Sequence, residues 1–184
     1  MNIFIGCSAR ENIDTKYKKS SKDLVEKVAQ IKNLNLVFGA YYKGLMAICY
    51  DCFKQNNKKV IGVTPEIYKD ALNEMSCDEE IITETTMERF NEIYKKSDIF
   101  LFLPGGIGTL AELFNAMEEN RTNGIDKKII LYNKDFFYTP IIKELYNMYK
   151  EKFIDLELSK YIIIESNLDN VIKLIKEEIN KYEW

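Results

Sequence analysis

The sequence contains no histidine, and this absence excludes several common catalytic mechanisms. Neither a Ser-His-Asp nor a Cys-His nucleophile can be assembled, and the H-E-x-x-H zinc motif cannot occur. A histidine pH switch is excluded for the same reason. Acid–base chemistry would have to use carboxylates, lysine, tyrosine, cysteine or water.

Cysteine is also scarce, with four residues in the chain: Cys7, Cys49, Cys52 and Cys77. Cys49 and Cys52 form a C-x-x-C pair inside an expected helix, but no second pair accompanies them. A closed zinc site would have to recruit Cys7 and Cys77 as well. We therefore expect buried thiols in a reducing compartment, and neither a metal nor a cofactor.

The chain has neither an excess of basic residues nor a long hydrophobic run. The net charge is −3, and lysine and glutamate are interleaved, which argues against a nucleic-acid partner. The apolar residues at the start are too few for a signal peptide, and no stretch approaches the length of a membrane span. We expect a cytoplasmic protein with no membrane partner.

What the sequence does contain is a regular alternation of strand-like and helix-like segments, which predicts an α/β fold. We expect a single-domain, Rossmann-like, doubly wound and mostly parallel sheet with helices on both faces, covering residues 1–184. The expected strands are Asn2–Gly6, Leu34–Phe38, Lys59–Val63, Glu80–Thr83, Ile99–Leu103, Lys128–Tyr132 and Tyr161–Ile164. The expected helices are Thr15–Lys32, Gly44–Gln55, Thr85–Lys96, one beginning near Thr109, Phe136–Lys150 and Leu168–Lys181, while Tyr68–Cys77 is ambiguous.

The most informative segment is a glycine-rich turn between a strand and a helix. The buried strand Ile99–Leu103 ends at Pro104, which has no N–H to donate to a sheet. Glycines then allow a sharp turn and close approach of a ligand, and the following helix begins with unpaired N–H groups. This arrangement predicts a phosphate site formed by Gly105, Gly106, Ile107, Gly108 and Thr109.

Two other interpretations of this segment remain open. Thr109 and Glu112 fit the T-x-x-E capping box, in which both side chains only close the start of a helix. Residues 106–111 also fit G-x-G-x-x-A, the fingerprint of a dinucleotide-dependent oxidoreductase, although it follows a late strand instead of the first one. The G-x-x-x-x-G-K-[ST] motif of P-loop ATPases is absent.

The segment Pro104-Gly105-Gly106-Ile107-Gly108-Thr109-Leu110-Ala111-Glu112 resembles the P-G-G-x-G-T-x-x-E signature of the Lonely Guy (LOG) family. Further matches follow in the same order over about Ile3 to Ile154. They are Phe38-Gly39 with Gly44-Leu45-Met46, Ile61–Pro65, Glu88-Arg89 and Ser97-Asp98.

The resemblance implies a phosphoribohydrolase whose substrate is the 5'-monophosphate of a cytokinin riboside or of another nucleoside, such as AMP. It would release the free base and ribose 5-phosphate and would not be a lysine decarboxylase, although relatives often carry that label. Glu112 and Arg89 would be the catalytic residues. The substrate would contact Gly105–Thr109, Gly39, Met46 and Ser8. The resemblance also implies a homodimer.

The sequence departs from the family pattern at positions around the expected site. The family's triple glycine is Gly39-Ala40-Tyr41 here, the lysine after the arginine is Phe90, and a later glycine is Ala47. Lys43 is a candidate to replace the missing positive charge. These departures favour the alternative of a non-catalytic nucleotide-binding or sensing module. A separate alternative concerns Arg89 itself: as an ordinary surface arginine it would pair with Glu88 or Glu92.

Overall fold

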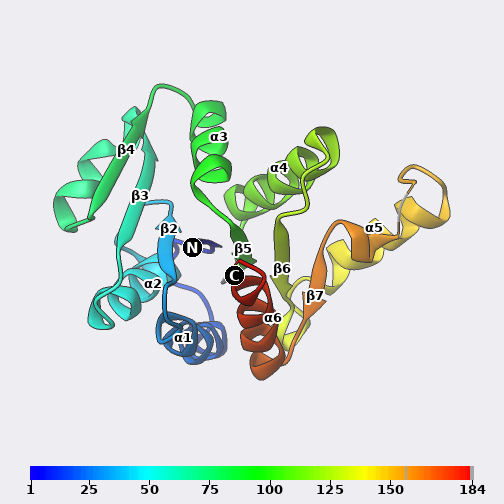
Figure 1. Ribbon diagram of the computed structural model, residues 1–184, viewed down its shortest axis with the longest axis horizontal. Coiled ribbons are helices and arrows are strands. Elements are labelled where there is room, and N and C mark those ends of the chain that lie inside the picture. The colour runs from blue at the N-terminus through cyan, green and yellow to red at the C-terminus, as the bar shows by residue number, and fades with distance from the viewer. Residues whose placement is uncertain (156, 183–184) are drawn as a thin grey trace.

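Seven parallel strands form one sheet in the computed structural model, which describes residues 1–155 and 157–182. The strand order is β4-β3-β2-β1-β5-β6-β7, and every neighbouring pair is parallel (Figure 1). The strands are β1 (Asn2–Gly6), β2 (Asn35–Phe38), β3 (Val60–Pro65), β4 (Glu79–Thr83), β5 (Ile99–Phe102), β6 (Lys128–Tyr132) and β7 (Ile163–Glu165).

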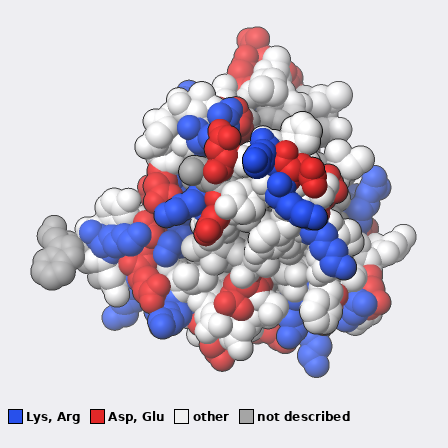
Figure 2. All heavy atoms as spheres, turned by 90° about the vertical axis from the view of Figure 1, so that its right-hand side faces the viewer, with Lys and Arg blue, Asp and Glu red and all other residues white. Residues whose placement is uncertain are grey.

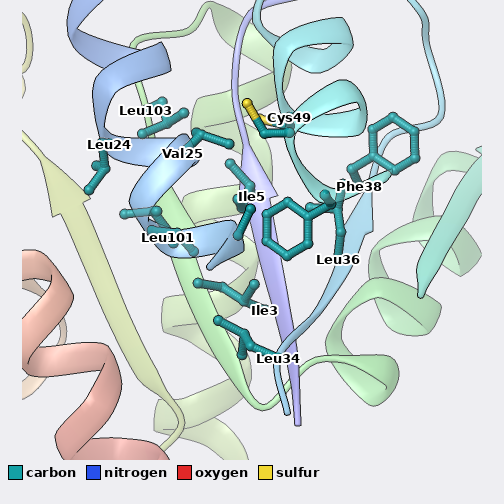
Figure 3. Packing of buried hydrophobic residues seen from close by; sticks show 14 of the residues in the cluster. Ile3, Ile5, Leu24, Val25, Leu34, Leu36, Phe38, Cys49, Leu101 and Leu103 are labelled. Carbon is teal, nitrogen blue, oxygen red and sulfur yellow. The ribbon is translucent and has the colours of Figure 1, made fainter. Parts of the chain in front are cut away.

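Six α-helices cover the two faces of this sheet. They are α1 (Thr15–Ala29), α2 (Gly44–Gln55), α3 (Thr86–Lys96), α4 (Ile107–Asn123), α5 (Thr139–Lys150) and α6 (Leu168–Asn180). The apolar residues of α1, α2 and α6 pack on one face of the sheet, where Val25, Leu36 and Cys49 belong to one buried cluster (Figure 3). Those of α3, α4 and α5 form a second cluster on the opposite face. The expected doubly wound α/β fold is confirmed.

The strand order reverses its direction between β1 and β5, which are adjacent in the sheet although β2, β3 and β4 lie between them in the chain. Ligands of open parallel sheets bind at such a switch point, outside the carboxyl ends of the strands. The expected glycine turn follows β5 directly, so the fold places it at this point.

Several element boundaries differ from the expected ones for local reasons. The ambiguous segment forms a 3₁₀ helix over Glu66–Glu74, and the segment expected to begin a helix at Phe136 begins one only at Thr139. Asp135 and Phe136 have φ values of 55° and 59°, which a continuous helix does not accommodate. Tyr161 closes the turn over Leu158–Lys160, so β7 starts at Ile163.

Candidate functional site

The carboxyl ends of β1 and β5 and the start of α2 are joined by backbone hydrogen bonds. The Ser8 N–H donates to the Pro104 carbonyl at 3.2 Å, and the Leu45 N–H donates to the Ser8 carbonyl at 2.8 Å. The half-buried Ser8 therefore lies between the glycine turn and the N-terminus of α2. Its hydroxyl accepts a hydrogen bond from the Arg10 N–H at 3.0 Å.

The glycine turn presents unpaired N–H groups in open space. Gly106 is the N-cap of α4, no side chain caps this helix, and the first helical bond runs from the Leu110 N–H to the Gly106 carbonyl. The N–H groups of Ile107, Gly108 and Thr109 thus precede that bond, as an anion site at a helix N-terminus requires. A Cβ built on Gly106 or Gly108 meets nothing within 4 Å, so no described side chain fills the turn.

The capping-box interpretation of Thr109 and Glu112 is wrong. Helix α4 begins at Ile107, two residues earlier than expected, so Thr109 lies inside its first turn. Thr109 is buried, and a Cβ added to Gly105 would lie 2.1 Å from its Oγ1 atom. The missing side chain of Gly105 therefore allows the turn to pack directly against Thr109.

The carboxylate of Glu112 forms a buried ion pair with Arg89. The Arg89 Nη2 and Glu112 Oε1 atoms are 2.8 Å apart, and the two side chains are only 11% and 6% exposed. The Arg89 Nε–H donates to the Val63 carbonyl at the end of β3, at 3.0 Å. The surface-arginine interpretation is wrong, because Glu88 accepts from the Glu84 N–H and Glu92 pairs with Lys95.

Burial and Arg89 act in opposite directions on the acidity of Glu112. Burial raises the pKa of Glu112 above that of an ordinary glutamate, and the positive charge and hydrogen bond of Arg89 partly counteract this rise. A carboxyl group with a raised pKa in a water-poor site is suited to acid–base or electrostatic catalysis. Arg89 is the group that favours its ionised form.

Cys7 and Tyr138 are close enough to Glu112 for its charge to affect them. The Cys49 thiol, 4.0 Å from Cys7, raises the pKa of Cys7 together with burial, and the charge of Glu112 adds to this effect. Burial also raises the pKa of Tyr138, whose hydroxyl donates to the Leu103 carbonyl at 2.6 Å. Cys7 therefore remains a neutral thiol and is unsuited to be a nucleophile.

Gly39 and Met46 lie beside the Arg89–Glu112 pair. A Cβ built on Gly39 would be 2.7 Å from Arg89 Nη2 and 3.1 Å from Met46 Cε. The next residue, Ala40, is buried with a φ of 52°, so this alanine keeps a left-handed backbone that glycine would favour. The structure thus brings Gly39 and Met46 to the Arg89–Glu112 pair, while Ser8 is linked to the glycine turn through its backbone.

Sequence reasoning missed two parts of this arrangement. The Val63 carbonyl holds Arg89, and its only signal in the sequence is that it lies near the end of an apolar strand. Tyr138 supports the carbonyl that precedes Pro104, but nothing in the sequence distinguishes it from the chain's other tyrosines.

Next to the glycine turn, on the side of α5, there is an open and mainly apolar hollow of about 400 Å³. Its lining includes Gly105, Leu110, Tyr138, Ile141 and Glu144. The hollow and the turn share Gly105, so a ligand bound at the turn has apolar surface within reach on this side.

Candidate metal ligands, cysteines, apolar helices and surface charge in the described part of the chain bear on its cofactors and partners. Within residues 1–155 and 157–182, no group of three or more Cys, Asp or Glu side chains is arranged to hold a metal ion. All four cysteines are free, and Cys7, Cys49 and Cys52 are buried as expected. No described helix is long and apolar enough to cross a membrane. Basic and acidic side chains are mixed on the face shown in Figure 2.

The open space at Gly108 gives a prediction in which stability and binding change in opposite directions. Alanine is the better helix former, so Gly108→Ala should raise the free energy of unfolding by about 0.5 kcal/mol. The new methyl group would occupy space that a phosphate needs and should weaken AMP binding by about tenfold, as expected for one lost charge-assisted hydrogen bond. Urea unfolding and calorimetric titration with AMP measure both effects, and unchanged affinity would argue against a ligand at this turn.

Comparisons with known proteins find relatives that match over most of this chain. Cytokinin riboside 5'-monophosphate phosphoribohydrolase LOG2 of Arabidopsis thaliana is 26% identical over 184 residues, covering 98% of this chain and 85% of that protein. LOG1 of the same plant is 26% identical over 187 residues, covering 98% and 84% of the two chains.

Solved structures show the same fold at lower identity. The molybdenum cofactor carrier protein of Chlamydomonas reinhardtii superposes with a TM-score of 0.71 at 17% identity, covering 97% of this chain and 98% of that one. The molybdenum cofactor binding protein of Rippkaea orientalis gives 0.67 at 23% identity, with coverages of 97% and 96%. Residues 46–175 match a family described as "Possible lysine decarboxylase". The chain belongs to this family, the LOG family, as the glycine turn and its glutamate led us to expect.

Proposed function

We propose that this protein hydrolyses the N-glycosidic bond of a nucleoside 5'-monophosphate and releases the free base and ribose 5-phosphate. The observation that carries the proposal is the position of Glu112 on α4, five residues after the first residue of this uncapped helix and paired in the interior with Arg89 of α3. An anion held at the helix start places the sugar of a nucleotide within reach of the carboxylate. The names of the LOG relatives support the same reaction.

The reaction requires stabilisation of positive charge on the ribose. As the bond between C1' and the base nitrogen breaks, its electron pair leaves with the base, and the sugar becomes an oxocarbenium-like species. A fixed carboxylate at Glu112 stabilises this charge and accepts a proton from the attacking water. The water oxygen forms the new bond to C1'. The departing base nitrogen takes a proton from solvent, and Glu112 returns to solvent the proton that it accepted.

The glycine turn supplies binding energy and orientation. The N–H groups of Ile107, Gly108 and Thr109 hold the 5'-phosphate at the positive end of the α4 dipole. Arg89 orients Glu112 through the 2.8 Å contact and favours its ionised form. The reaction needs neither a metal nor a cofactor in this scheme, and lysine is not a substrate.

A panel of substrates tests this proposal. We expect the protein to release free base from at least one nucleoside 5'-monophosphate, AMP or a cytokinin riboside monophosphate among them, and much more slowly from the matching nucleosides, which lack the phosphate. Chromatography quantifies the free base and the ribose 5-phosphate in equal amounts. Absence of base release from every monophosphate would contradict the proposal.

The alternative function for a protein with this fold is binding of a nucleotide-like ligand without turnover. The solved structures with this fold include a carrier and a binding protein for molybdenum cofactor. Ala40, Tyr41 and Phe90, which replace family residues beside the site, favour this alternative. Saturable binding of a monophosphate with no release of base would support it over the hydrolase.

We also propose that the protein forms a homodimer. Met87 on α3 and Ile107 and Phe114 on α4 are exposed apolar side chains, with exposures of 62%, 89% and 40%. Exposed apolar side chains on neighbouring helices favour a subunit interface there. Light scattering of the purified protein measures the mass of the assembly.

A further inference from the structure

Gly39 lies directly after β2. A glycine is required there because a larger side chain would clash with a neighbouring group, and not because of the backbone conformation. Among the described glycines only Gly44 and Gly124 have a positive φ, so the backbone at Gly39 suits any residue. A Cβ added there would lie 2.7 Å from Arg89 Nη2, a distance that real Cβ atoms do not show. The missing side chain therefore leaves room for the guanidinium group.

The atom that approaches Gly39 is the same atom that pairs with the expected catalytic acid. Arg89 Nη2 lies 2.8 Å from Glu112 Oε1, while Nε donates to the Val63 carbonyl at 3.0 Å. A methyl group at position 39 would have to push Nη2 away, because Nε and the helix backbone hold the rest of the side chain. The displacement would fall on the Arg89–Glu112 contact.

We propose that Gly39 is a positioning residue: its missing side chain admits Arg89 to Glu112 and so fixes the orientation of the pair. The inference rests on the proposed function, because that function gives the Arg89–Glu112 pair its catalytic role. This role is distinct from the expected contact of Gly39 with the nucleotide, which stays a prediction.

Among the described residues, Arg89 is the positively charged partner of Glu112. Arg89 comes from α3, Cys7 directly follows β1, and Tyr138 immediately precedes α5. Cys7 and Tyr138 are neutral, so displacement of Arg89 leaves the carboxylate without charge compensation from the groups that face it.

The first test is the variant Gly39→Ala. We expect kcat to fall by about 10- to 100-fold with little change in KM, since a displacement of about 1 Å can cost this much. The acid limb of the pH–rate profile should move to higher pH, because Glu112 loses its positive partner. The melting temperature should stay near the parental value, since a flexible side-chain end can move. An unchanged acid limb would overturn the proposal.

Gly62→Ala is the matched control. A Cβ at Gly62 would lie 3.0 Å from Ala40 Cβ and 3.0 Å from Cys77 Sγ, so it crowds the core, and none of the three atoms nearest to it belongs to Arg89. This variant should lower the melting temperature and leave the acid limb where it is. A shift of the limb equal to that of Gly39→Ala would show that general crowding, and not Arg89, is responsible, and would overturn the proposal.

A double-mutant cycle tests whether Gly39 acts through Arg89. On an Arg89→Met background, Gly39→Ala should cause no further loss of kcat, because the displaced group is already absent. Two losses that multiply would contradict the proposal.

A measurement that needs no turnover separates this inference from the proposed hydrolase activity. Carbon-13 NMR of the Glu112 carboxyl group should show a higher pKa in Gly39→Ala than in the parent protein. If the parent releases no base but the pKa rises, the hydrolase proposal fails and the positioning role stands. If the parent is active and the pKa is unchanged, only the positioning role fails.

Discussion

Replacement of Glu112 by glutamine is expected to lower the rate of base release by about 10³-fold, within the range for loss of a general base or a charge-stabilising group. Glutamine has nearly the same shape and still accepts a hydrogen bond from Arg89, but it carries no negative charge for the oxocarbenium ion and takes no proton from water. The variant should still bind AMP, because the glycine turn is unchanged. Steady-state release of free base measures the effect.

Glu118→Gln is the matched control on the same helix. Glu118 is exposed and pairs with Arg121 on the surface of α4, so its charge is far from the buried site. This variant should release base at the parental rate. If Glu112→Gln is as active as Glu118→Gln, Glu112 is not the catalytic carboxylate.

Replacement of Arg89 by methionine is expected to move the acid limb of the pH–rate profile to higher pH. The ionised carboxylate is the active form of Glu112, so the rate rises with pH through its pKa. Burial raises this pKa and Arg89 lowers it, so removal of the guanidinium group raises it further. At neutral pH the rate should fall by about 100-fold, and part of the loss should be recovered at higher pH.

Arg121→Met is the control for this prediction. Arg121 is exposed and its partner is Glu118, so its removal should leave the pH–rate profile unchanged. A profile of Arg89→Met that keeps the parental acid limb, or shifts it to lower pH, would show that Arg89 does not favour the ionised form of Glu112.

The features of the site that depend on local sequence were predictable. The apolar run Ile99–Leu103, Pro104 and the glycines define a strand, a turn and a helix start, and each depends on the properties of neighbouring residues. The alternation of elements also predicted the parallel sheet, which in turn brings strand ends to one edge.

The features that depend on contacts across the fold were not predictable from local patterns. The T-x-x-E spacing at Thr109 is compatible with a capping box, and it is the burial of Glu112 against Arg89 of another helix that shows this side chain turned inward. Within α3, Glu88 and Glu92 are acidic residues that lie closer to Arg89 in the sequence, at i−1 and i+3. The role of Gly39 depends on a side chain 50 positions later in the sequence, which no local pattern contains.

A crystal structure of Glu112→Gln with AMP bound would test the central claim most directly. We predict that the 5'-phosphate accepts hydrogen bonds from the N–H groups of Ile107, Gly108 and Thr109, and that C1' of the ribose faces the side chain at position 112. A nucleotide whose phosphate lies away from this turn, or whose sugar points away from position 112, would contradict the account.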